Sequence, residues 1–304
     1  MASIRFSLLL LTILLTIAAC QNKGNRNNSD AVEFDVVFMT DVHVLDKSQV
    51  LQGYAQAIKE VNALNPDFVI NGGDMIMDAL KVHFDTAAHL LHLFDSVTSM
   101  LETPFYPTIG NHDIFAWYFG DSLKSHPAYG KQFYIQNFSK AYYTIDQHNW
   151  RFFFLDGITK TPEHKYIGQI DSIQMQWIQN VLDTTSSDKQ LAIVSHIPFI
   201  TTGYQIWKGA LEPNPPHGVV ENSTRVLELF KNHQLQLVLQ GHLHIYEKVF
   251  INDIWFITGG AVSSRWWQGK NKGLEEGFLK LKLGNSGVID ASYHPFEWEV
   301  YQTQ

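Results

Sequence analysis

The most constraining feature of this chain is a repeated pattern in which a short apolar run is followed at once by Asp, Asn or His. Short apolar runs bounded by turn residues predict buried β-strands. Between them lie segments with the apolar spacing of helices, such as 48–64, which Asn65 and Pro66 close, and 86–101. This alternation favours an α/β fold with mixed sheets and extra β-structure. No Pro/Gly/Ser-rich linker divides the chain after its N-terminal segment, so we expect one domain.

Five predicted strands deliver polar residues at their carboxyl ends. The runs are 34–40, 68–71, 105–109, 191–195 and 235–239. In chain order they are followed by Asp41-Val42-His43, Gly73-Asp74, Gly110-Asn111-His112-Asp113, His196 and Gly241-His242-Leu243-His244. In open α/β sheets that edge is where ligands bind. A single Gly-Asp or a lone His would be weak evidence, but five in register predict one shared site, and this mixed oxygen and nitrogen set suits Zn, Mn or Fe.

The ordered set D-x-H, G-D, G-N-H-D, H and G-H-x-H resembles the calcineurin-like metallophosphoesterase family over roughly residues 34–250. The resemblance implies two packed mixed β-sheets flanked by helices, as a four-layer sandwich. It also implies a centre for two divalent or trivalent transition metal ions (Mn, Zn or Fe). By this resemblance the ligands are Asp41, His43 and His244 for one ion, Asn111, His196 and His242 for the other, and Asp74 as the bridge.

Two such ions can activate a water and stabilise a phosphoryl transition state, so the expected chemistry is phosphate-ester hydrolysis. The resemblance places His112 outside the ligand set, facing the substrate as an acid or charge stabiliser. A carboxylate should orient it, and Asp113 and Asp78 are both candidates. Asp78 lies four residues after Asp74, whereas protein phosphatases of the family place that carboxylate three residues after. Residues 75–77 also lack the tyrosine ligand of purple acid phosphatases.

The N-terminus predicts a lipoprotein signal peptide over residues 1–19. Arg5 precedes a short apolar run over 8–19, and small residues then lead to Cys20, the only cysteine. This arrangement resembles a bacterial lipobox, although an ordinary signal peptide would also explain it. We therefore expect a lipid anchor at Cys20, a tether over 20–33, a catalytic domain over 34–304, and a place in the bacterial cell envelope facing the periplasm or the cell surface.

Charge bounds the substrate. The formal net charge is −8, and no Lys/Arg cluster predicts the basic groove of a nuclease of the same family. We expect a small phosphorylated substrate, monoester or diester, acted on outside the cytoplasm. A ligand-binding lipoprotein without catalysis is the alternative from another class, but a degenerate member should lack ligands, and none is missing here. The sequence leaves the oligomeric state open.

Two further segments carry weaker indications. Residues 118–142 are aromatic and polar without clear periodicity, which predicts a long loop or lid over the site. Arg265 could contact a phosphate, and the adjacent Trp266 and Trp267 could stack on a base or sugar. Core packing beside a surface salt bridge explains the same three residues and is the plainer interpretation.

Overall fold

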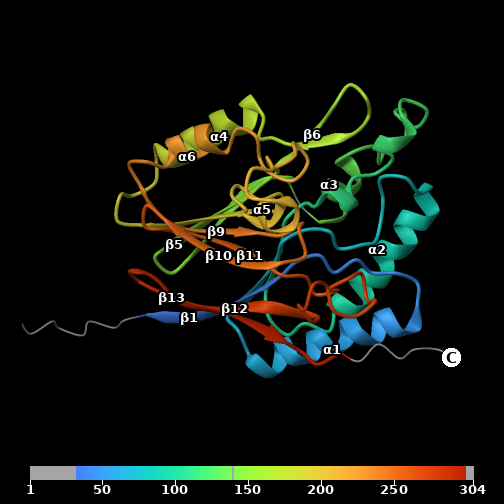
Figure 1. The fold of residues 1–304 in the computed structure, drawn as a ribbon, viewed down its shortest axis with the longest axis horizontal. Coiled ribbons are helices and arrows are strands. Elements are labelled where there is room, and N and C mark those ends of the chain that lie inside the picture. Colours follow the sequence, from blue (N-terminus) through green and yellow to red (C-terminus); the bar gives the residue numbers. More distant parts are fainter. Residues whose placement is uncertain (1–31, 139, 299–304) are drawn as a thin grey trace, which may run out of the picture. The chain divides into compact units, whose positions relative to one another are not determined.

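The computed structural model describes residues 32–138 and 140–298. The predicted signal peptide, the acylation site at Cys20 and most of the predicted tether lie outside the described residues, so they stay predictions. Within the described part, two large sheets lie face to face and helices cover their outer faces (Figure 1). The α/β class of two packed mixed sheets flanked by helices, a four-layer sandwich, is therefore confirmed.

The first sheet contains the strands that open the domain. Its order is β13 (Gly287–Pro295), β12 (Gly277–Gly284), β1 (Glu33–Met39), β2 (Phe68–Asn71) and β3 (Phe105–Pro107). Strands β1, β2 and β3 are parallel, and β12 is antiparallel to both of its neighbours. Helices α1 (Ser48–Leu64) and α2 (Phe84–Thr98) follow β1 and β2 and lie on the outer side of this sheet (Figure 1).

The second sheet contains the later strands. Its order is β10 (Tyr246–Ile251), β11 (Ile254–Gly259), β9 (Gln234–Gln240), β8 (Gln190–Ser195), β5 (Trp150–Leu155) and β4 (Tyr143–Gln147). Strands β5, β8, β9 and β11 are parallel, and β4 and β5 form an antiparallel hairpin. Helices α4 (Ser172–Leu182) and α6 (Ser223–Leu229) cover its outer face (Figure 1).

Strand alternation divides the core into layers. In β1, Phe34, Val36 and Phe38 pack between the two sheets, whereas Val37 and Met39 pack in the cluster shared with the helices. Successive side chains of a strand point to opposite faces, so a strand that is covered on both sides is apolar throughout. Each such burial contributes about 1.5–3 kcal/mol.

Short elements fill the remaining segments. The hairpin of β6 (Ile158–Lys160) and β7 (Tyr166–Gly168) and the helix α5 (Gly203–Lys208) were not predicted. The predicted loop over 118–142 contains the helix α3 (Gln132–Asn137). A helix of six residues is too short to show a helical period in the sequence. In the described part of the chain, no helix combines the length and apolarity that a membrane span requires.

Candidate metal centre

The candidate centre lies where the carboxyl ends of strands from both sheets meet. Main-chain hydrogen bonds join the loops that follow β1 and β2, since the Asp41 amide donates to Gly73 O at 3.0 Å and the His43 amide to Asp74 O at 3.0 Å. In the other sheet the Gly241 amide donates to His196 O at 3.0 Å. Neighbouring loops are thus tied edge to edge, which fixes the backbone from which the polar side chains project.

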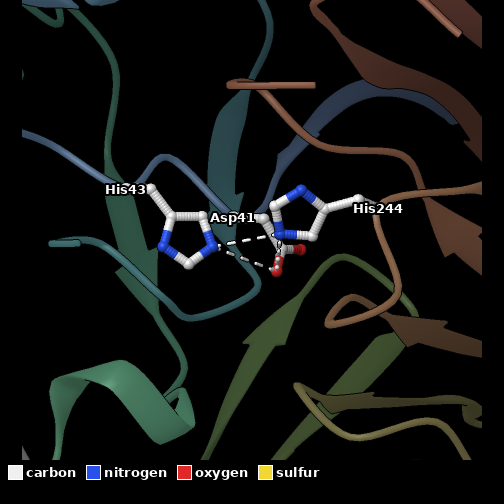
Figure 2. Close-up of side chains that lie close together, drawn as sticks. All are labelled: Asp41, His43 and His244. Atoms are coloured by element: carbon white, nitrogen blue, oxygen red, sulfur yellow. Dashed lines mark hydrogen bonds and ion pairs between the residues drawn. The ribbon is translucent and has the colours of Figure 1, made fainter. Parts of the chain in front are cut away.

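The first cluster joins the two sheets through Asp41, His43 and His244. His43 Nε2 lies 3.0 Å from His244 Nε2, and His244 Nε2 lies 3.3 Å from Asp41 Oδ1. Figure 2 shows the two imidazole rings turned toward each other beside the Asp41 carboxylate. All three side chains are buried. These atoms converge closely enough to bind one metal ion together.

The second cluster surrounds Asp74. His196 Nε2 lies 3.1 Å from Asp74 Oδ2 and 3.1 Å from Asn111 Oδ1. A ring nitrogen of His242 lies within 4.8 Å of the Asp74 and His196 ligand atoms. Asp74 also reaches the first cluster, since its Oδ2 is 3.7 Å from His43 Nε2. Asp74 therefore occupies the position between the two clusters that a bridging ligand requires.

The tautomers of two histidines make this arrangement suited to a cation. His196 Nδ1 lies 2.8 Å from Gly72 O, and His244 Nδ1 lies 2.5 Å from Ser264 O. A ring nitrogen that faces a carbonyl oxygen donates its proton, so in a neutral ring Nε2 carries the lone pair. Those lone pairs point at carboxylate oxygens of Asp74 and Asp41. A nitrogen lone pair that faces a carboxylate oxygen is stable only when a cation or a proton lies between the two atoms. The donor set therefore fits a metal ion.

The electrostatics of the protein groups at the centre agree with this fit. Burial disfavours the charged form of His196, but the Asp74 carboxylate outweighs it and raises the pKa of His196 to about 9. Burial would raise the pKa of Asp41, yet the charge and hydrogen bond of His244 prevail and lower it to about 2. Burial and the neighbouring His196 lower the pKa of His242 to about 3. The carboxylates of Asp74 and Asp41 thus favour a positive charge beside them, as the carboxylates of a metal site do.

The backbone at the centre is strained. Five of the seven predicted ligands have φ in the left-handed region: Asp41 at 56°, His43 at 50°, Asp74 at 56°, His242 at 71° and His244 at 51°. Each such non-glycine residue costs on the order of 1–3 kcal/mol and persists where surrounding contacts hold it. This strain turns consecutive side chains toward one point, and alternation along a strand could not do that.

His112 and the two candidate carboxylates occupy different environments. The His112 ring packs edge-on against His43 at 4.9 Å between centroids, and its Nδ1 lies 3.9 Å from Asp78 Oδ1. Asp113 instead accepts hydrogen bonds at 2.9 Å from the amides of Asp74, Met75 and Gly110. Asp78 is therefore the carboxylate that faces His112, while Asp113 holds the ligand loops together.

Several contacts have no signature in the sequence. Thr40 Oγ1 donates to Asp41 Oδ2 at 2.7 Å, and the orienting acceptors of two histidines are main-chain carbonyls. One of them belongs to Ser264, in the segment that follows β11. Arg265 is exposed, and no ion pair of its guanidinium occurs within residues 32–138 and 140–298. For the segment of Ser264, the one indication in the sequence is that Gly259 and Gly260 end a predicted strand, which places the residues after them at the same edge of the sheet.

Comparisons with known proteins agree with the geometry. The family model for calcineurin-like phosphoesterases matches residues 34–246, whereas no curated protein matches the chain. In fold the chain is similar to a dimetal phosphatase from Danio rerio, at 15% identity and a TM-score of 0.58, over 88% of this chain and 100% of that one.

Two further structures share the fold. One is a purple acid phosphatase from yellow lupin seeds, at 16% identity and a TM-score of 0.54, over 90% of this chain and 53% of the other. The second is described as the anchor in the inner membrane complex of Plasmodium, at 18% identity and a TM-score of 0.54, over 89% of this chain and 87% of that one. Both likenesses concern the fold alone.

Proposed function

Because the chain belongs to the calcineurin-like phosphoesterase family and is a metal-dependent phosphoesterase, we propose that it hydrolyses small phosphate esters, monoesters or diesters, outside the cytoplasm. The seven proposed ligands of its binuclear centre are Asp41, His43 and His244 on one side, Asn111, His196 and His242 on the other, and Asp74 between them. Metal identity is the least specified element, since Mn, Zn and Fe all accept such ligands.

A single observation supports this proposal most strongly. Main-chain carbonyls fix Nδ1 of His196 and His244 as donors, so Nε2 of each neutral ring directs its lone pair at a buried carboxylate oxygen. Bound cations would neutralise phosphoryl oxygens and lower the pKa of water there, which is the chemistry that ester hydrolysis needs. Buried and strained residues keep these donor atoms in place, so little reorganisation accompanies binding.

His112 is the proposed acid on the substrate side. Its side chain is about a quarter exposed, unlike the buried side chains of His43 and Asp74, and its Nδ1 faces Asp78. That carboxylate would orient the ring with Nδ1 toward Asp78, so that Nε2 is the atom that can pass a proton to the leaving oxygen. His112 also donates its amide to Asp74 Oδ1 at 2.8 Å, which couples its position to the bridging ligand.

The test is hydrolysis of p-nitrophenyl phosphate and bis-p-nitrophenyl phosphate by the purified protein, with Mn²⁺ or Zn²⁺ and with chelator. Asp74→Ala should abolish turnover, whereas Asp85→Ala, which removes an exposed carboxylate at the start of α2, should not. Turnover that persists at full rate in Asp74→Ala or in chelator would refute the two-metal assignment. The ratio of diester to monoester turnover shows which of the two ester classes the protein prefers.

The place of action is also part of the proposal. A net charge of −8 supports a small substrate over a nucleic acid, and the lone cysteine after a short apolar run supports acylation at Cys20 in a bacterial envelope. A non-catalytic binding role is the second candidate, since a protein of similar fold is named as an anchor. Failure of metal-loaded, folded protein on a panel of phosphate esters would favour that second role.

A further inference from the structure

The segment 263–267 crosses from the end of β11 onto the candidate metal centre. Ser263 Oγ donates to Asp41 O at 2.7 Å, and Trp267 Nε1 donates to Val42 O at 2.8 Å. From the other side, His244 Nδ1 donates to Ser264 O at 2.5 Å. The segment is thus fastened to the loop after β1 and to the loop after β9, which belong to different sheets.

Within this segment Trp266 differs from its neighbour. Trp267 is buried with 2% exposure, but Trp266 keeps 43% of its surface exposed. The Trp266 ring centroid lies 5.0 Å from that of His244 and 6.4 Å from that of His43. A large aromatic side chain therefore stands open to solvent directly beside two proposed metal ligands.

The backbone holds Trp266 there against its intrinsic preference. Its φ is 50°, between Ser264 at 45° and Trp267 at 64°. Left-handed φ costs on the order of 1–2 kcal/mol for each residue with a side chain. Burial of Trp267 can account for its own conformation, but it gives no reason for an exposed ring at Trp266. Strain combined with exposure beside a reaction centre points to a ligand.

We propose that Trp266 is a stacking platform for a flat ring carried by the substrate, so that nucleoside phosphates are hydrolysed in preference to phosphates of small aliphatic alcohols. This inference rests on the proposed phosphoesterase function and specifies its substrate class. The phosphoryl group would lie at the cluster of His43 and His244, and the base would lie over the exposed part of the indole. Stacking suits any base, because every base has a π-face.

The opposite side of the centre is also aromatic. The Tyr166 ring of β7 lies 6.2 Å from the His242 ring, edge-on, but most of its surface is covered. Trp266 has the greater exposed area of the two, and its indole is the larger ring. The base is therefore assigned to the side of the first cluster.

The first experiment compares KM for adenosine 5′-monophosphate and for glycerol phosphate in the Mn²⁺-loaded protein and its variants. Trp266→Ala should raise KM for the nucleotide roughly ten-fold, as expected for the loss of one base stack. The KM for glycerol phosphate and the kcat for both substrates should stay at the wild-type values. Trp266→Phe should restore most of the affinity for the nucleotide. The control is Phe250→Ala, which removes another exposed aromatic ring, at the far end of β10.

The second experiment measures binding without turnover. Calorimetry uses the phosphonate analogues of the same two compounds, in which carbon replaces the bridging ester oxygen. We expect Trp266→Ala to weaken only the nucleotide analogue, again roughly ten-fold. If the wild-type protein hydrolyses neither of these monoesters nor bis-p-nitrophenyl phosphate, the proposed function fails, and calorimetry still decides whether Trp266 binds a base.

Two results would overturn the platform. Equal losses for the nucleotide and the glycerol compounds in Trp266→Ala would mean that the indole only positions His43 and His244. Unchanged binding of both compounds would mean that the exposed ring takes no part in recognition. Should Trp266→Ala fail to fold, competition by free adenosine against glycerol phosphate in the wild-type protein gives the same decision, since a stacked base should compete and ribose should not.

Discussion

Replacing Gly110 by alanine tests whether close backbone approach sets the position of Asp74. A Cβ at Gly110 would lie 2.1 Å from Asp74 N and 2.2 Å from Asp74 Oδ1. The φ of Gly110 is −103°, which alanine adopts without strain, so the effect would come from this contact alone. Ordinary contacts between such atoms are about 3.5 Å, so Asp74 or residue 110 must move by on the order of 1 Å.

We expect a displacement of that size to lower phosphoesterase activity by on the order of 100-fold, because 1 Å misplacements at reacting centres have that effect. Overpacking should also lower the free energy of unfolding by about 1–3 kcal/mol. The assays are turnover of p-nitrophenyl phosphate, bound metal per chain and thermal unfolding. All three are needed, since loss of activity with full metal content would indicate a shifted bridge and not an empty centre.

Gly284→Ala is the matched control, because its Cβ would meet only the flexible end of Ile289, at 2.8 Å, far from the centre. It should keep wild-type activity. If Gly110→Ala turns over substrate at the wild-type rate with full metal content, then Asp74 tolerates displacement, and the argument from close approach is wrong.

Four further outcomes are expected. His112→Ala should lower kcat by roughly 10²–10⁴-fold while metal content, measured by emission spectrometry, stays unchanged; a variant that loses metal would contradict its place outside the ligand set. Asp113→Ala leaves three buried amides without their acceptor, so denaturant unfolding should show a loss of about 1–3 kcal/mol or more, and an unchanged midpoint would count against that role. Saturating Mn²⁺ should raise the melting temperature, corresponding to about 2.7 kcal/mol at 100 times Kd, and Asp74→Ala should cancel the rise. Hydrogen bonds from Arg151 lower the pKa of Asp146 in the folded protein. This pair therefore stabilises the protein above the unfolded pKa of about 3.9, and the contribution is lost as the pH falls through the folded pKa. In Asp146→Asn the free energy of unfolding should depend less on pH in the acid range, by a small amount because the carboxylate is partly exposed.

The sequence predicts the position of the centre because its motifs follow strands. Asp41 comes two residues after β1, and His196 directly follows β8, so recognising the strands was enough to bring these side chains to one edge. Spacing could not decide between Asp113 and Asp78, because the decision depends on which main-chain amides each carboxylate meets. Spacing could not tell that Trp266 is exposed and Trp267 buried either. Their left-handed φ values break the alternation of side chains along a strand from which burial is inferred.

The elements that sequence reasoning missed are those with few residues or with main-chain partners. Helix α3 and the hairpin of β6 and β7 are too short to show a period. The surrounding core accepts Phe133 and Tyr134 of the helix and Ile158 of the hairpin, and this burial stabilises both elements. The carbonyls that orient His196 and His244 belong to Gly72 and Ser264, and a carbonyl is present in every residue. Geometry alone reveals such partners.

The joining of both sheets at the first cluster has a consequence for the order of assembly. His43 and His244 are 201 residues apart in the chain, so their contact closes a loop that spans most of the domain. Contacts of such long sequence separation form late in folding, after the entropy of closing the loop has been met. During synthesis the N-terminal half emerges with Asp41 and Asp74 but without His242 or His244. The chain therefore gains its complete metal affinity only when nearly all of it has been made and folded, unlike small domains in which metal binding drives folding.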